Sequence, residues 1–214
     1  MAFSFDHKTG SSYTLTIFLE SPMRAGSCYL GLEETTGKIF RLRDPHGRFV
    51  WPGFPLFTVG KRYIFFKADT KYVSPFCEDI CVLPSSTRCV ETEGDDSITE
   101  PIFEKLLLRA HPSVEGVFNF QVKGCKYTNE GCKCPAFGIW EYSGGGIDIY
   151  EQSDDYRDQQ KRISLGGYDF PYKGSFPCAK IERRETDTPL LVVVGLSEPF
   201  AGSEDNILIL EGVI

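Results

Sequence analysis

The chain has 214 residues, a length that suits one large domain or two small ones. Hydrophobic residues make up 41% of it and charged residues 25%, which argues against a disordered protein. The formal net charge of -7 argues against a generic nucleic-acid coat protein, which is usually basic. No stretch approaches the ~20 apolar residues of a membrane helix. The first residues lack the pattern of a signal peptide, so we expect a cytoplasmic protein.

The first part of the chain reads as a series of short strands rich in β-branched and aromatic residues. A turn over residues 34–37, ending at Gly37, predicts a hairpin between the second and third strands. The loop 44–55 holds three prolines and carries Trp51. The predicted strands are residues 13–20, 27–33, 38–43, 60–67 and 78–83.

A polar, acidic stretch over residues 84–100 is the best candidate for a linker, and residues 101–110 follow as the one predicted helix. Beyond the helix, strand-like segments recur between glycine-rich turns. The segment 190–196 is apolar on both faces, which predicts a central, covered strand. The predicted strands of this part are 116–122, 136–142, 146–150, 161–165, 179–184, 190–196 and 207–214.

This order of elements predicts an all-β protein with one short helix. Two small barrels in tandem would leave no unpaired hydrophobic strand edges. We assign the first barrel to residues 1–84, an acidic linker and helix to 85–111, and the second barrel to 112–214. A single β-sandwich is the alternative architecture.

Positive charge is concentrated between Lys38 and Lys67, a stretch that contains seven lysines and arginines and only one acidic residue, Asp44. Aromatic residues are interleaved with these cations, the composition of a surface that stacks bases and tracks phosphates. Strand alternation places Arg41 and Arg43 on the same face. We expect Phe57, Phe65 and Phe66 to lie in the core and Trp51 to be exposed. The candidate nucleic-acid-binding residues are Lys38, Phe40, Arg41, Arg43, Arg48, Trp51 and Arg62. The alternative is that these cations are solvated strand faces.

The chain contains eight cysteines. Cys125, Cys132 and Cys134 lie within ten residues of one another and could converge on one structural zinc ion, with Cys178 or Cys89 as a distant fourth ligand. Free thiols and disulfides are the other two interpretations of this cluster. No other cofactor is expected.

Catalysis has little support in the sequence. His46 follows Asp44 closely, but a turn residue is the simpler interpretation. The pair Glu78 and Asp79 could serve a metal-dependent nuclease, yet no second motif accompanies it. We therefore expect a protein that is not an enzyme.

Three stretches together resemble the "dual OB-containing" family, prokaryotic domains built of two oligonucleotide/oligosaccharide-binding (OB) barrels. They are the Cys-x-x-Gly strand and Thr-Gly-Lys turn of residues 28–41, the Glu-Asp motif of residues 76–82, and the terminal pair formed by 196–200 and 207–214. Tryptophan is usual in the family where Phe40 stands, and histidine where residues 74–76 stand. The resemblance implies two OB-like barrels and a cytoplasmic nucleic-acid-binding accessory of prokaryotic conflict systems.

The sequence thus favours a non-catalytic module that binds single-stranded nucleic acid through the first barrel. The global acidity favours a protein–protein adaptor instead, and a secreted, disulfide-stabilised β-protein is a third hypothesis. On the first hypothesis, replacing Arg41 and Arg43 with glutamate should abolish oligonucleotide binding without unfolding the protein.

Overall fold

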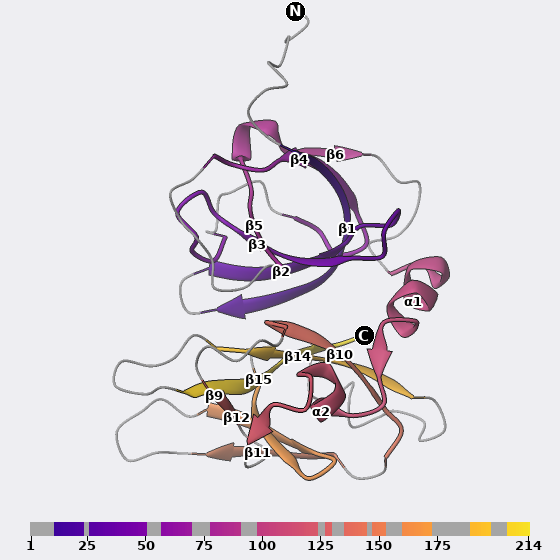
Figure 1. Ribbon diagram of the computed structural model, residues 1–214, viewed down its shortest axis with the longest axis vertical. Coiled ribbons are helices and arrows are strands. Elements are labelled where there is room, and N and C mark those ends of the chain that lie inside the picture. Colours follow the sequence, from indigo (N-terminus) through magenta and orange to yellow (C-terminus); the bar gives the residue numbers. More distant parts are fainter. Residues whose placement is uncertain are drawn as a thin grey trace, which may run out of the picture. The chain divides into compact units, whose positions relative to one another are not determined.

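The computed structural model describes residues 11–23, 26–50, 57–69, 78–90, 98–123, 127–129, 135–144, 147–152, 160–172, 189–197 and 205–214. The chain forms two compact units, Met1–Ile102 and Phe103–Ile214 (Figure 1). Strands dominate the described residues of both units, so the predicted all-β class is confirmed.

The first unit is a six-stranded sheet with the order β5-β3-β2-β1-β4-β6. Strands β1, β2 and β3 form an antiparallel meander, and β4 returns to pair with β1, which is a Greek-key arrangement. The short helix η1 (Pro84–Ser86) and β6 extend this unit into the stretch predicted as a linker. The strands are β1 (Ser12–Met23), β2 (Gly26–Leu32), β3 (Ile39–Arg43), β4 (Arg62–Phe66), β5 (Asp79–Cys81) and β6 (Arg88–Val90).

The sheet of the first unit curls until its two ends meet. Strand β5 pairs in parallel with β3, and an antiparallel bridge between Lys67 and Val82 joins the ends of β4 and β5. The amide of Ala68 also donates to the carbonyl of Cys81 at 2.8 Å. Strand β1 bends strongly around the unit (Figure 1), and its register shifts between Ile17 and Leu19. A bulge of this kind lets one strand pair with β2 along one part and β4 along another. The result is a small barrel.

The barrel interior is filled by apolar side chains from every strand of the cycle. Alternation along β4 sends Tyr63 and Phe65 into the core and leaves Ile64 on the outside. Phe57 is buried against both, so the prediction that Phe57 and Phe65 lie in the core is confirmed, whereas Phe66 is half-buried. The core comprises Leu15, Ile17, Tyr29, Leu42, Val50, Phe57, Tyr63, Phe65, Ile80 and Val82.

The strands of the second unit form a six-stranded sheet of order β7-β10-β14-β15-β9-β8 and a separate three-stranded sheet of order β11-β12-β13. Strands β11, β12 and β13 form a meander, β14 pairs with β10, and β15 pairs with β14 while a parallel bridge joins Tyr172 to Leu210. The predicted central strand is confirmed, since β14 is buried along its whole length between β10 and β15. The elements are α1 (Glu100–Leu107), β7 (Ala110–His111), α2 (Val114–Val117), β8 (Val122–Lys123), β9 (Tyr127–Asn129), β10 (Phe137–Tyr142), β11 (Ile147–Gln152), β12 (Gln160–Leu165), β13 (Tyr168–Pro171), β14 (Leu190–Leu196) and β15 (Asp205–Val213).

Residues 116–122 differ from the sequence prediction, which made them a strand. The hydroxyl of Ser113 accepts a hydrogen bond from the amide of Gly116 at 3.1 Å and caps α2. Asn119 and Phe120 then adopt positive φ angles of 52° and 60°, which no strand residue has. A local side-chain cap therefore prevails over the apolar alternation of this segment.

Helix α2 is tied to β13 by the hydroxyl of Tyr168, which donates to the Glu115 carboxylate. This hydrogen bond is the main reason why the pKa of Glu115 is lowered. Because the pKa of Glu115 is lower in the folded than in the unfolded protein, its ionised carboxylate stabilises the fold at pH values above the unfolded pKa. This stabilisation is lost as pH falls through the pKa of Glu115 in the folded protein.

Replacing Tyr168 with phenylalanine should therefore cost about 1 kcal/mol at pH 7, because the partner is a partly exposed charged group. This loss of stability should shrink as pH falls below 4.5, the ordinary pKa of a glutamate side chain, and disappear once Glu115 is protonated in the folded protein. Urea unfolding of both proteins at pH 7 and pH 3 measures it. An equal difference at both pH values would show that the carboxylate charge plays no part.

Candidate functional site

The candidate binding residues Arg41 and Arg43 lie on β3, where alternation sends both side chains to the same face, as predicted. The parallel neighbour β5 places Asp79 opposite Arg41 and Cys81 opposite Arg43. The amide of Arg41 donates to the carbonyl of Glu78 at 2.9 Å, which fixes the register of the two strands. One carboxylate is thus positioned between two guanidinium groups.

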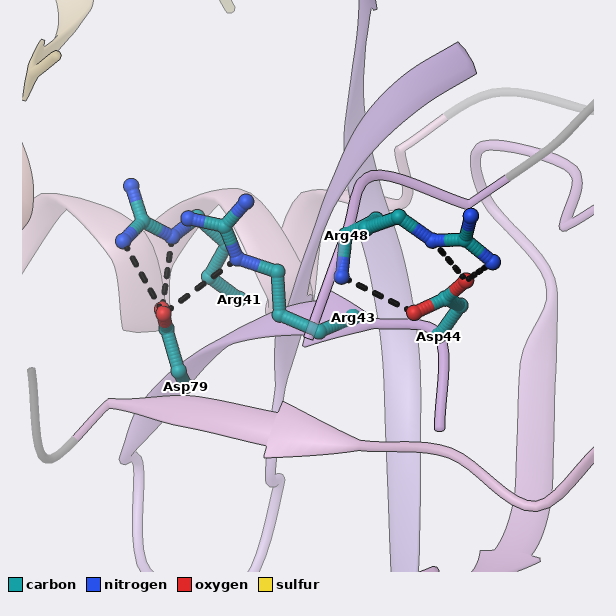
Figure 2. A network of polar contacts seen from close by, with 5 residues as sticks. All are labelled: Arg41, Arg43, Asp44, Arg48 and Asp79. Atoms are coloured by element: carbon teal, nitrogen blue, oxygen red, sulfur yellow. Dashed lines mark hydrogen bonds and ion pairs between the residues drawn. The ribbon is translucent and has the colours of Figure 1, made fainter. Parts of the chain in front are cut away.

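Asp79 binds both arginines (Figure 2). Arg41 donates from Nε to Oδ1 at 2.6 Å and from Nη2 to Oδ2 at 3.1 Å, a bidentate pair. Arg43 donates from Nε to Oδ2 at 3.2 Å, and its Cζ lies 4.6 Å from the centroid of the Phe49 ring. The side chains of Arg41, Arg43 and Asp79 are only 3%, 2% and 1% exposed.

This placement corrects the expectation that Arg41 and Arg43 belong to an exposed nucleic-acid-binding surface. A phosphate group cannot reach guanidinium groups that are buried and already held by a carboxylate. The glutamate double variant suggested by the sequence would place like charges around Asp79, so we expect it to unfold the first barrel rather than to separate binding from folding.

Arg48 is held by a turn that Asp44 organises, also drawn in Figure 2. Asp44 Oδ1 accepts from the amides of His46 and Arg48, both at 2.8 Å, and its Oδ2 accepts from Arg48 Nε at 3.0 Å. His46 is therefore a turn residue, as the sequence indicated. The Arg48 side chain is 56% exposed, so this cation stays at the surface while bound to Asp44.

The other candidates lie on different elements of the first unit. Lys38 is exposed at the end of the β2–β3 hairpin, and Phe40 is half-buried with its ring edge-to-face against Tyr13 at 5.5 Å. Arg62 is 38% exposed, and its Nη1 lies 3.9 Å from Oε1 of Glu34. Trp51 lies outside the described residues. The structure therefore brings Arg41 and Arg43 together as a buried pair on β3 and leaves Lys38, Arg48 and Arg62 at the surface.

The predicted zinc ligands Cys125, Cys132 and Cys134 lie outside the described residues, as does Cys178, so that site stays a prediction. Among the described cysteines, Cys28 and Cys81 are buried and Cys89 is exposed. Burial is the main cause that raises the pKa of Cys81, followed by the charge of Asp79. Within the described part of the chain, no three His, Cys, Asp or Glu side chains come together in a way that could hold a metal ion.

Two residues of the first unit are not identified by the sequence patterns above. Asp79 stands in an acidic pair, and its role is signalled only by the arginine–x–arginine strand, since two buried arginines require a carboxylate nearby. Arg88 was counted within the acidic linker, yet it lies on β6 of the first sheet.

No family model and no curated protein matches this chain. The resemblance to the dual OB-containing family therefore stays a prediction. Across the described residues, no helix combines the length and apolarity that a membrane crossing needs.

Proposed function

We propose that the protein is a non-catalytic module of two small barrels that binds single-stranded nucleic acid. The observation that carries this proposal is the Greek-key connectivity of the first unit, in which the meander β1-β2-β3 is closed by the later strands β4 and β5. OB barrels are five-stranded Greek-key barrels of this general design, and they bind oligonucleotides. Lys38, Arg48 and Arg62 supply exposed positive charge on the first unit.

Titration of a fluorescein-labelled oligothymidylate with the purified protein, followed by fluorescence anisotropy, tests the proposal. We expect micromolar binding at low salt, because stacked bases worth about 1–3 kcal/mol each and phosphate contacts together can supply the roughly 8 kcal/mol that this affinity requires. Added salt should weaken the complex, since phosphate contacts release counterions. An unchanged anisotropy at low ionic strength would overturn the proposal.

A protein–protein adaptor is the second candidate, and a specific observation favours it. Leu108 and Phe120 in the second unit are 84% and 80% exposed, so both large apolar side chains are accessible to a partner. Phe120 also has a φ of 60°, and such strain in a bulky residue is found most often at functional sites. The adaptor function becomes the better proposal if the oligonucleotide titration shows no binding.

A further inference from the structure

The outer face of strand β4 brings together residues that lie far apart in the sequence. Tyr63 and Phe65 point into the core, so Arg62, Ile64 and Phe66 point away from it. Arg62 is 38% exposed and Ile64 is 39% exposed. This face therefore combines a cation with an accessible apolar side chain.

Strand β6 adds a second arginine to the same face. Arg88 lies directly opposite Ile64 in the antiparallel β4–β6 ladder, and residues directly opposite one another point to the same side of a sheet. Arg62 is the diagonal neighbour of Arg88, within reach for two long side chains. On the other side of Ile64, β1 contributes the exposed Thr14. Arg88 itself is exposed.

The β2–β3 hairpin extends the face beyond Arg62. Glu34 in this hairpin accepts a hydrogen bond from the Thr16 hydroxyl at 2.5 Å, and its Oε1 lies 3.9 Å from Arg62 Nη1. These contacts hold the hairpin beside β4, and the exposed Lys38 lies at the end of the same hairpin. We call the resulting set the β4 surface, which comprises Thr14, Lys38, Arg62, Ile64 and Arg88.

The face of β2 and β3 where OB barrels usually bind ligands differs sharply from the β4 surface. Opposite the core side of β2, Cys28, Leu30 and Leu32 are fully buried. On β3, Arg41 and Arg43 are bound to Asp79. An extended polyanion therefore finds no accessible cation among these residues.

We propose that the β4 surface is where the first unit binds the phosphate backbone of single-stranded nucleic acid, with Arg62 and Arg88 as the main contacts. This inference rests on the proposed function. Guanidinium groups suit phosphate because they donate two parallel hydrogen bonds, and their planes also stack on unpaired bases. Ile64 between the two arginines offers apolar contact to a base or sugar. Lys38 adds a third positive charge.

The test compares the wild-type protein with the double variant Arg62→Ala/Arg88→Ala in the anisotropy titration. With three phosphate contacts on a single strand, a fourfold rise in salt should weaken wild-type binding about 20-fold. The variant keeps one of these contacts, so the same rise in salt should weaken its binding about threefold. If the two proteins bind equally at about 1 M salt, loss of two contacts at about 0.7 in log slope each predicts binding about 25-fold weaker for the variant at about 0.1 M salt. The matched control is Arg109→Ala/Lys123→Ala, which removes two exposed cations from the second unit and should behave like wild type.

The outcomes separate this inference from the proposed function. No binding by the wild-type protein would overturn the proposed function. Wild-type binding with unchanged affinity and salt dependence in the Arg62→Ala/Arg88→Ala variant would overturn only the β4 surface. Photocrosslinking of a bromodeoxyuridine oligonucleotide to the unmodified protein gives an independent reading that needs no folded variant. Crosslinks in peptides spanning residues 62–66 or 88–90 support the β4 surface, and crosslinks confined to the second unit contradict it.

Discussion

Replacing Asp79 with alanine is expected to lower the free energy of unfolding by about 3–5 kcal/mol, because it leaves two buried guanidinium groups without the carboxylate that both of them bind. A loss of this size is a large fraction of the stability of a small domain. Urea unfolding followed by intrinsic fluorescence or circular dichroism measures it.

Asp169→Ala is the matched control for this variant. Asp169 also binds an arginine, Arg162, at 2.6 Å, but the two side chains are 15% and 28% exposed. Water can replace the lost partner there, so the expected cost is about 1 kcal/mol or less. Equal costs for Asp79→Ala and Asp169→Ala would show that burial is not what makes the Asp79 network important.

A compensating variant tests the same explanation from the other side. Replacing Arg41 and Arg43 with methionine and Asp79 with leucine removes all three charges and keeps side chains of similar size. This triple variant should recover most of the stability that Asp79→Ala loses, since apolar replacements of buried ion pairs are often neutral. A triple variant as unstable as Asp79→Ala would contradict the electrostatic origin of the loss.

Gly26→Ala is the second variant with a large expected effect. Gly26 has a φ of 135°, and a Cβ atom there would lie 2.4 Å from the carbonyl oxygen of Val50. That oxygen cannot move aside, because it accepts the amide of Ser27 at 2.8 Å in the bridge between β2 and Val50. Strain and overlap together predict a loss of about 2–5 kcal/mol in the free energy of unfolding.

Gly167→Ala separates the two causes. Gly167 also has a positive φ, 85°, but a Cβ atom there would meet nothing within 4 Å. Only backbone strain is added, so we expect a loss of about 1 kcal/mol. Urea unfolding of both variants provides the comparison, and a Gly26→Ala protein as stable as Gly167→Ala would refute the steric contribution.

Local patterns predicted the longer described strands, because such patterns depend on neighbouring residues, but they missed β6, β7, β9 and β13. The predicted strand 179–184 lies outside the described residues. The segment 190–196, apolar on both faces, is the covered strand β14, and the alternation of residues 38–43 placed Arg41 and Arg43 correctly on one face. The prediction of a strand over residues 116–122 was wrong, because the Ser113 cap and two positive φ angles prevail over the apolar alternation of this segment.

The environment of the two arginines could not be read from the same alternation. Whether their face meets water or a carboxylate depends on the parallel pairing of β3 with β5, which joins residues 38 positions apart in the case of Arg41 and Asp79. The same limit applies to Arg88, whose place beside Ile64 requires β6 to pair with β4. Composition alone reports how many cations a segment has, and long-range pairing decides which of them a ligand can reach.

The position of Asp79 at the start of the closing strand has a consequence for synthesis on the ribosome. Until residue 79 emerges, the two arginines of a nascent β2–β3 hairpin lack the carboxylate that binds both of them in the finished barrel. Proteins are made from the amino terminus onward, and contacts distant along the chain form slowly. We expect the meander to stay hydrated and reversible during translation, and to commit to the barrel only when the aspartate arrives.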